Sequence, residues 1–347
     1  MKTKFWLFLL PLALMYSCGN TGVTLPSVTG TQFEVLVVMN DTAWKDSAGI
    51  ALENVLGQYV DGLPQAEPNM DVHHCNQEQF TSVLMPTRNI VLTDIAEKYS
   101  APKITYGKDR WAAPQAFVKI TAPSDTAFTR IIKEKGQEIL NFFIVMERER
   151  QMYFNKDYLD AKDQTAIEKM FGIQIDIPQG ISKATVKKDF YWLTNDNPTI
   201  REDIVIYSYP YTDKNTFTKD FLIAKRDSVM KANIPGELKG SYMGTELKYA
   251  DPMFREITVN GGYAAELRGL WRMMNGAAMG GPFYSQTRLD EIHQRVITIE
   301  AFVFAPGKNK RNPMRQMEAV VYSAKLPQEI NAIKEVSVVA KKENKEK

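Results

Sequence analysis

The order of the hydrophobic patterns changes near residue 160, and this change constrains the fold more than any other feature. Before it, strand-like and helix-like patterns alternate, which is typical of a compact α/β unit. The apolar run Phe33–Met39 predicts a strand buried on both faces, and Ser47–Val60 has the spacing of a helix. Further strands are expected over Met70–Cys75, Asn89–Ile95 and Gln115–Thr121. Ser124 is placed to cap a long helix to about Arg150, and its charged end, residues 147–150, is expected to face water.

Beyond the polar joint Asn155–Gln164, strand-like patterns follow one another in runs. They are Gly172–Pro178, Asp189–Thr194, Asp203–Tyr209, Ser241–Tyr249, Tyr263–Met273, Gly281–Thr287 and Gln294–Ala305. Helices are expected over Thr165–Phe171 and over Thr218–Lys231, and Asn312 is expected to cap a last helix with Pro313 at its first position. Runs of antiparallel strands covered by helices make an α+β sandwich.

These patterns predict a two-domain protein of the α+β / α/β class. Single cores stop growing at roughly 250 to 300 residues, and this chain has 347. We expect an N-terminal α/β domain over residues 31–154 and a C-terminal domain over 165–330, an antiparallel sheet flanked by helices. Residues 336–347 are expected to form a charged, solvated tail.

The clearest alternation in the chain lies over Tyr263–Met273. Apolar side chains occupy one set of alternate positions, while Glu266, Arg268 and Arg272 occupy the other. This alternation predicts an antiparallel strand with one face exposed to solvent.

The first 17 residues have the features of a secretory signal peptide. Lys2 and Lys4 precede the apolar run Phe5–Met15, which is shorter than the about 20 residues that span a bilayer. Ser17 directly before Cys18 resembles a bacterial lipobox, in which the cysteine is acylated, with palmitate for example, and becomes the new N-terminus. The resemblance implies a cell-envelope lipoprotein that is held to the bilayer through Cys18 and faces the periplasm. An ordinary signal peptide with a nearby cysteine is the alternative. Residues 18–30, rich in Gly, Thr, Ser and Pro, would form a flexible leash.

Short motifs along the mature chain are similar to an uncharacterised family of Bacteroidota-type lipoproteins. They are LPQAEP (63–68), RNI (88–90), IPG (234–236), GLW (269–271) and MGGPF (279–283). This resemblance implies no activity. Residues 165–330 also resemble the PsbP-like fold, through GIQIDIPQG, FYWL, IVIYSY, GLW and RVITIEAFVFAP. That resemblance implies a domain that binds or stabilises partners.

Charge and cysteine content restrict the partners and the chemistry. Without Lys2 and Lys4, the 43 Lys and Arg residues fall to the number of Asp and Glu residues, 41. A nucleic-acid partner is therefore not expected, because it would need a concentrated basic face. Apart from Cys18 the chain has only Cys75, so the fold has no internal disulfide and its stability must come from packing.

Residues that could bind a metal or act as a nucleophile cluster at one strand. Asp71, His73 and Cys75 share one face of that strand and are all zinc-ligand types. Residues two apart on a strand are separated by about 7 Å, which is too far for easy convergence on one ion, so no metal and no cofactor are expected. His74 adjoins Cys75 but points to the opposite face, and no G-x-S-x-G motif is present, so no catalytic residue is assigned.

Glu266 and Glu300 could supply paired carboxylates for glycan cleavage if their two strands were neighbours. The competing interpretation is a charged strand face on which Arg268 and Arg295 neutralise these acids.

The glycine-proline segment 280–283 and a basic cluster are the remaining candidates for binding. Two interpretations of the segment are open. Its glycines either form a tight connection that needs positive φ, or they belong to a loop that binds a ligand or partner. For the second case the candidate binding residues are Trp271, Arg268, Phe283 and Met279. Lys308, Lys310, Arg311 and Arg315 form the basic cluster, which is either solvated or contacts anionic head groups or peptidoglycan.

The sequence thus favours a membrane-anchored, non-enzymatic binding or assembly factor whose partner is an envelope protein or peptidoglycan. Two alternatives stay open: a peptidoglycan or glycan hydrolase that uses paired carboxylates, and small-ligand binding in the cleft between the two domains.

Overall fold

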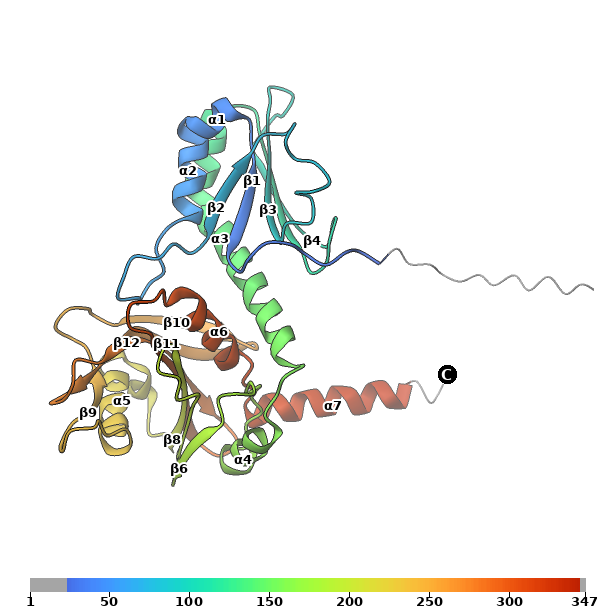
Figure 1. Ribbon diagram of the computed structural model, residues 1–347. Coiled ribbons are helices and arrows are strands. Elements are labelled where there is room, and N and C mark those ends of the chain that lie inside the picture. Colours follow the sequence, from blue (N-terminus) through green and yellow to red (C-terminus); the bar gives the residue numbers. More distant parts are fainter. Residues whose placement is uncertain (1–23, 344–347) are drawn as a thin grey trace, which may run out of the picture.

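The computed structural model describes residues 24–343, with side chains for residues 24–335, and the chain forms two domains (Figure 1). The expected two-domain α+β architecture is confirmed. Cys18 and the signal segment lie outside the described residues. Within the described part of the chain, no helix combines the length and the apolar character needed to cross a bilayer.

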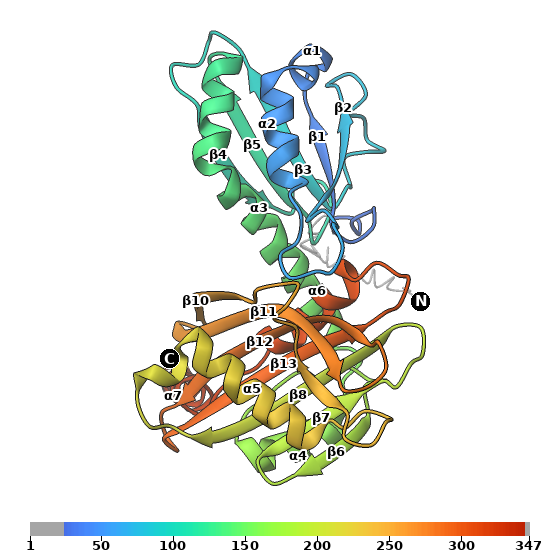
Figure 2. The ribbon, with the colours of Figure 1, turned by 90° about the vertical axis from the view of Figure 1, so that its left-hand side faces the viewer.

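The N-terminal domain is a five-stranded mixed sheet with the strand order β2-β1-β3-β5-β4. Its strands are β1 (Glu34–Val38), β2 (Asp71–Cys75), β3 (Asn89–Ile95), β4 (Lys103–Lys108) and β5 (Ala116–Ala122). All neighbours are parallel except β4 and β5. The helices are α1 (Asp41–Lys45), α2 (Ser47–Leu56) and α3 (Asp125–Asn155). Figure 2 shows α2 and α3 side by side on one face of the sheet, where they bury the main core of the domain.

The C-terminal domain is an eight-stranded antiparallel sheet with the order β10-β11-β12-β13-β8-β7-β6, and β9 also pairs with β11. Its strands are β6 (Lys183–Lys187), β7 (Phe190–Thr194), β8 (Arg201–Pro210), β9 (Tyr242–Thr245), β10 (Met253–Val259), β11 (Gly262–Met274), β12 (Gly280–Asp290) and β13 (Arg295–Phe304). The helices are α4 (Ala161–Phe171), the 3₁₀ turn η1 (Lys214–Phe217), α5 (Lys219–Asn233), α6 (Arg311–Tyr322) and α7 (Pro327–Glu343). Helices α4 and α6 pack on one face of the sheet and α5 packs on the other.

Three strands were not expected from the sequence. All three lie at the edge of a sheet and have few buried side chains. Strand β6 is exposed throughout, and β4 and β10 have mostly exposed or half-buried side chains. Conversely, the strand predicted over Gly172–Pro178 is wrong. That segment makes only isolated bridges, at Gln174 and Pro178, and it buries Ile173, Ile175 and Ile177 in the core without joining the sheet.

Strand β11 is buried on both faces over its middle, and of the three charged side chains expected on its solvent face only Arg272 is exposed. Its apolar positions face α5, but Glu266 and Arg268 on the other face are also buried, with 3% and 8% of their surface exposed. The reason is that α6 covers this face, and the acidic and basic side chains neutralise one another there.

The far end of α3 does not simply face water either. Glu147 is buried and accepts hydrogen bonds from Arg88, Asn89 and Arg150. Arg150 also donates to the backbone carbonyl of Pro114. Of the charged run at residues 147–150, only Arg148 and Glu149 keep substantial exposure. The other two side chains, Glu147 and Arg150, are buried and bind each other, because buried charges must be paired.

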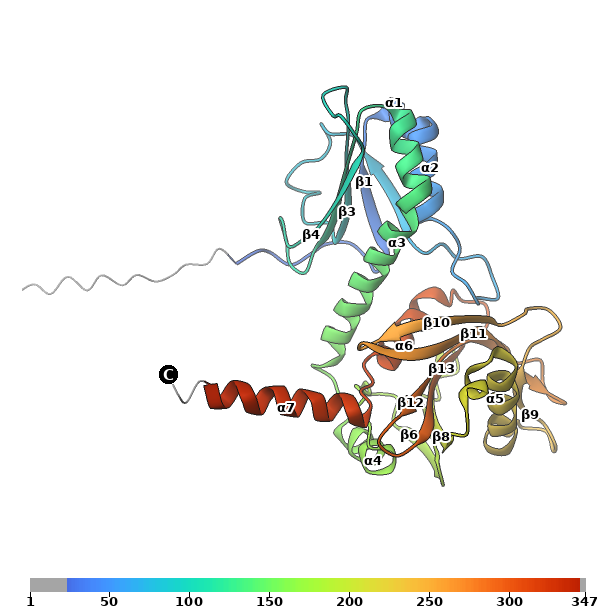
Figure 3. The same ribbon diagram turned by 180° about the vertical axis from the view of Figure 1, so that it is seen from behind.

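Helix α3 connects the two domains. It begins at its cap Ser124, packs on the N-terminal sheet, and continues downward to pass beside α6 (Figure 1). Helix α7 projects from the C-terminal domain, which is plain from behind in Figure 3. It extends to Glu343, so it includes most of the segment that was expected to be a tail.

A candidate site in the cleft between the domains

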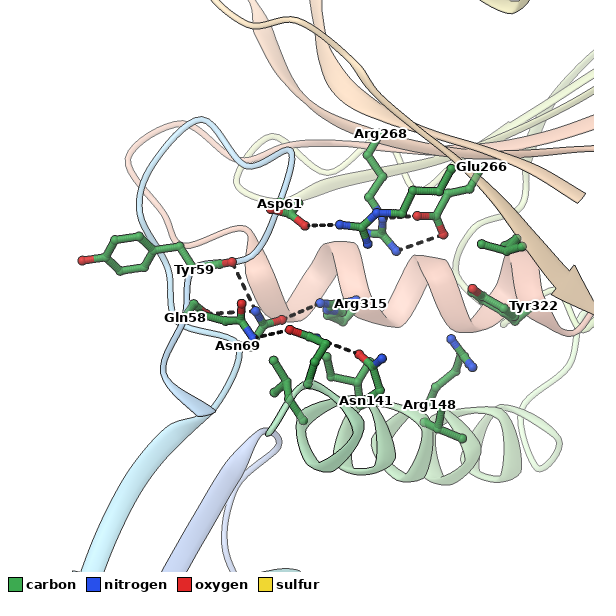
Figure 4. Close-up of a pocket in the computed structure, with 16 residues that line it drawn as sticks. Gln58, Tyr59, Asp61, Asn69, Asn141, Arg148, Glu266, Arg268, Arg315 and Tyr322 are labelled. Atoms are coloured by element: carbon green, nitrogen blue, oxygen red, sulfur yellow. Dashed lines mark hydrogen bonds and ion pairs between the residues drawn. The ribbon is translucent and has the colours of Figure 1, made fainter. Parts of the chain in front are cut away.

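A cavity of about 540 Å³ lies where α3 faces α6 and the edge of the C-terminal sheet. Figure 4 shows α3 on one side, α6 behind, strands above, and the loop after α2 closing the left end. Both domains contribute to the lining, which comprises Gln58, Tyr59, Asp61, Asn69, Gln137, Leu140, Asn141, Ile144, Val145, Arg148, Arg255, Ile257, Glu266, Arg268, Arg315 and Tyr322. A volume of this size is typical of small-molecule sites, which range over about 300 to 1,000 Å³.

A buried ionic network lies on the C-terminal side of the cleft. Arg268 donates from Nε to Glu266 Oε1 at 2.9 Å and from Nη2 to Glu318 Oε2 at 3.2 Å. Arg315 donates from Nη1 to the same carboxylate oxygen of Glu318 at 2.8 Å. Burial alone would raise the pKa of Glu318, but the charges of Arg268 and Arg315 outweigh it and lower that pKa to about 2. Glu318 is therefore held ionised, and two arginines share its charge.

The N-terminal domain closes one end of the cleft with amide side chains. Asn69 accepts from Arg315 Nη2 at 2.7 Å and donates to the backbone carbonyl of Gln58 at 2.9 Å. Gln58 donates to Gln137 Oε1 at 2.9 Å, and Gln137 donates to Asn141 Oδ1 at 3.0 Å. This direction of donation leaves the NH₂ group of Asn141 with no acceptor among the described residues.

An exposed ion pair spans the rim. Arg255 of β10 donates to Asp61, in the loop after α2, at 2.6 Å, and both side chains are about half exposed. This pair joins the two domains across the mouth of the cleft. Because both side chains are exposed to solvent, it is a weak closure rather than a structural support.

The domains are held together by stronger contacts next to the cleft. Glu67, in the N-terminal domain, accepts hydrogen bonds from the backbone N–H groups of Lys310 and Arg311, at 2.7 and 2.8 Å. Helix α6 thus begins at Arg311, two residues before Pro313, and its N-terminus is capped by a carboxylate from the other domain instead of by Asn312 as predicted. Arg311 also forms a bidentate pair with Asp71, at 3.0 and 2.7 Å. The cleft is therefore preformed.

Arg148 differs from the other arginines of the cleft. Its guanidinium lies 3.6 Å from the centroid of the Tyr322 ring on α6, and it makes no ion pair with a described carboxylate. Asn141 and Arg148 are seven residues apart and therefore lie on one face of α3. Figure 4 shows both side chains pointing from α3 into the space below α6.

Counting charges gives the cleft an excess of one cation. Arg268, Arg315 and Arg255 are matched by three carboxylates, those of Glu266, Glu318 and Asp61. Arg148 is the cation that remains. Low effective dielectric between two packed helices strengthens its attraction for an anion.

The second half of the chain is similar to a domain of unknown function (DUF4837), which matches over residues 160–323. A second domain of unknown function (DUF8532) matches residues 28–154. The two matches meet at the boundary between the two domains of the structure, and together they agree with an uncharacterised family. No match was found among curated proteins. The resemblance to the PsbP-like fold stays a prediction.

Of the four binding residues suggested by the sequence, only Arg268 borders the cleft. Trp271 and Phe283 are core residues of the opposite face, with 3% and 1% of their surface exposed, and Met279 packs against the same core. The indole of Trp271 donates to the backbone carbonyl of Val303. Trp271 and Phe283 therefore do not form an exposed apolar surface.

The glycines before Pro282 do not serve a turn with positive φ. Neither Gly280 nor Gly281 has positive φ, and both begin strand β12. A Cβ on Gly281 would lie 2.0 Å from the carbonyl oxygen of Val303, so close strand packing is what requires glycine there.

Glu266 and Glu300 do not form a pair. They lie on opposite faces of the sheet, since Glu266 is opposite Gln286 whereas Glu300 is opposite the neighbouring Ser285. Glu300 is fully buried beneath α5 and accepts two hydrogen bonds from Arg226 Nε and one from Nη2. Arg295, expected as a partner for these acids, pairs with Asp290 instead.

The other sequence candidates have structural partners. Asp71 binds Arg311, Cys75 is buried, and His74 stacks on Trp44. Within residues 24–335, no three His, Cys, Asp or Glu side chains are arranged to hold a metal ion. In the basic cluster, Arg311 and Arg315 bind the N-terminal domain rather than solvent, because they belong to the interface between domains.

Sequence reasoning missed Asn141, Arg148 and Tyr322. The first two were assigned to a long amphipathic helix, and Tyr322 to a terminal one. The available signal was the polar stripe Gln137, Asn141, Arg148 on a helix too long for one domain, which indicates a second packing partner.

Proposed function

We propose that the protein is an envelope-anchored, non-enzymatic binding factor whose ligand site is the cleft between the two domains. The observation that carries this proposal is the preformed cavity lined by both domains, with donors at Asn141 and Arg148 that have no acceptor among the described residues. Small-molecule sites characteristically combine a concave surface with a few convergent polar groups, and they often lie at domain interfaces.

Cys18 supplies the anchor in this proposal. Its place after Ser17 and the apolar run supports acylation, and the leash predicted over residues 18–30 would hold the folded domains close to a membrane. The last part of that segment already belongs to the N-terminal domain, since Ser27 and Thr29 form bridges to Ala113 and Thr87. The proposed location is the periplasmic side of a bacterial envelope membrane.

The state of the cleft carboxylates favours binding over glycan hydrolysis. A glycosidase needs a carboxylic acid that stays protonated near neutral pH, which requires a raised pKa. Glu318 has a pKa lowered to about 2, so it is not prepared to donate a proton. Glu266 is engaged in an ion pair with Arg268.

The test is recovery of a bound small molecule. The protein is purified under native conditions from its own membrane fraction, and molecules released by heat are identified by mass spectrometry. Val145→Trp places a large side chain in the cleft, and Val186→Trp, on exposed strand β6, is the matched control. We expect one compound at near-stoichiometric amount in the wild type and in Val186→Trp, and its loss in Val145→Trp. The same yield in all three proteins, or no compound in any, would contradict the proposal.

The anchor is tested separately. Cys18→Ala should leave an unprocessed precursor and abolish incorporation of labelled fatty acid, whereas Cys75→Ala should change neither. Persistent labelling of Cys18→Ala would show that the lipid is attached elsewhere.

A further inference from the structure

The excess cation in the cleft restricts the kind of ligand that it can hold. We propose that the cleft binds a short peptide with a free carboxylate, and that Arg148 and Asn141 hold this carboxylate. This inference rests on the proposed function, because it assigns the chemical class of the ligand in the same cavity.

The donors are arranged for a planar anion. Arg148 carries five N–H donors in a fixed fork that matches the two oxygens of a carboxylate. Its contact with the Tyr322 ring, at 3.6 Å, limits the freedom of the guanidinium and leaves its edge available. Asn141 lies about two helical turns before Arg148 on the same face of α3. Its NH₂ group adds a further donor with no acceptor among the described residues.

The net charge of the cleft favours one negative charge. Among the arginines that line the cleft, Arg148 alone has no partner among the carboxylates of the described residues, so a ligand with one charge makes the cleft neutral. A phosphate monoester carries about −1.5 to −2 at neutral pH and would leave negative charge unpaired beside Glu266 and Glu318. A neutral ligand would leave the guanidinium without its partner.

The rest of the lining is complementary to a peptide backbone. Gln58, Asn69 and Gln137 present amide groups, which both donate and accept, as peptide bonds do. Four aliphatic side chains lie among these amides and offer contacts for small apolar side chains: Leu140, Ile144, Val145 and Ile257. The cavity of about 540 Å³ suits a molecule of a few residues.

The experiment uses three probe libraries with the purified protein, residues 19–347. The first is a mixture of N-acetylated tripeptides with free C-terminal carboxylates, the second contains the same sequences as C-terminal amides, and the third contains phosphoserine tripeptide amides. Retained members are counted by mass spectrometry after equilibrium dialysis. The variants are Arg148→Gln and, as the matched control on the same helix, Arg130→Gln, an exposed residue remote from the cleft.

We expect wild type and Arg130→Gln to retain carboxylate tripeptides over the matching amides and phosphopeptides. Arg148→Gln should lower the affinity for the retained acids by about 10- to 100-fold, the usual effect of losing a charge-assisted hydrogen bond. Equal retention of acids and amides, preference for the phosphopeptides, no retention of any acid, or an unchanged affinity in Arg148→Gln would overturn the inference.

The failure of this inference is distinguishable from the failure of the proposed function. A neutral or phosphorylated compound released from the wild type and lost in Val145→Trp would refute the carboxylate inference alone. Absence of any compound that depends on the cleft would refute both.

Discussion

The guanidinium of Arg148, on the helix that links the domains, lies 3.6 Å from the centroid of the Tyr322 ring on α6. Each domain thus contributes one member of a contact between a cation and an aromatic face. The contact fixes an unpaired positive charge in a half-buried position, where an anion from solution is attracted to it.

This contact predicts different effects for two substitutions of Tyr322. Tyr322→Phe keeps the aromatic face and should change the free energy of unfolding by less than about 0.5 kcal/mol. Tyr322→Leu removes that face and should cost about 0.5 to 1 kcal/mol more than Tyr322→Phe. Urea unfolding followed by circular dichroism measures both values, and equal stability of the two variants would contradict the contact.

The cap on α6 predicts that Glu67 stabilises the junction of the two domains. Glu67→Ala would leave the buried N–H groups of Lys310 and Arg311 without their acceptor, so we expect a loss of about 1 to 3 kcal/mol. Glu78→Ala, at an exposed position of the same domain, is the control and should be nearly neutral. A Glu67→Ala protein as stable as the control would show that water replaces the cap without cost.

The pair at the rim predicts a small coupling that depends on salt. A double-mutant cycle with Asp61→Asn and Arg255→Gln should give about 0.2 to 1 kcal/mol at low ionic strength, because both groups are about half exposed. At 1 M salt the Debye length is only about 3 Å, and the coupling should disappear. A coupling above 2 kcal/mol that persists in salt would make this pair a structural bond instead of a weak closure.

Glu202 predicts a pH dependence of stability. Burial, with a smaller contribution from the charge of Asp203, raises the pKa of Glu202 from 4.5 to about 7. The folded protein therefore binds a proton that the unfolded chain releases, and stability falls as pH rises from about 4.5 through about 7. Glu202→Gln should remove this loss, so its stability relative to wild type should increase by about 1 to 3 kcal/mol between pH 5 and pH 8.

Urea midpoints at pH 5 and pH 8 give this difference directly. Glu237→Gln, an exposed acid outside the sheet, should show no such change. A constant difference between Glu202→Gln and wild type at the two pH values would mean that Glu202 is ionised in the folded protein throughout this range.

Much of the fold follows from local patterns, because they reflect burial by nearby structure. Strand β3 has the bounds that its apolar run predicted, and Ser124 caps α3 as expected. Strands β6 and β10 were not predicted, because edge strands bury few side chains and therefore show little hydrophobic periodicity in the sequence. The cap of α6 could not be predicted from the local sequence either, since the acceptor, Glu67, comes from a different domain.

A ligand in the cleft between the two domains was one of the alternatives from the sequence, but the lining of that cleft could not be predicted, because it depends on how the two domains meet. Glu266 and Arg268 looked like an exposed polar face, and only α6 packed over β11 turns them into a buried network. The polar stripe that contains Arg148 indicated a second packing partner for α3, but it did not identify Arg148 as a binding residue, since an arginine on a polar helix face is usually solvated.

Binding of a ligand in the cleft is tested most directly by a crystal structure of the protein purified natively from its membrane, without steps that strip small molecules. We expect electron density for one bound molecule between α3 and α6, with an anionic group against Arg148. An unfilled cleft in protein from that source, or a bound molecule elsewhere on the two domains, would contradict it.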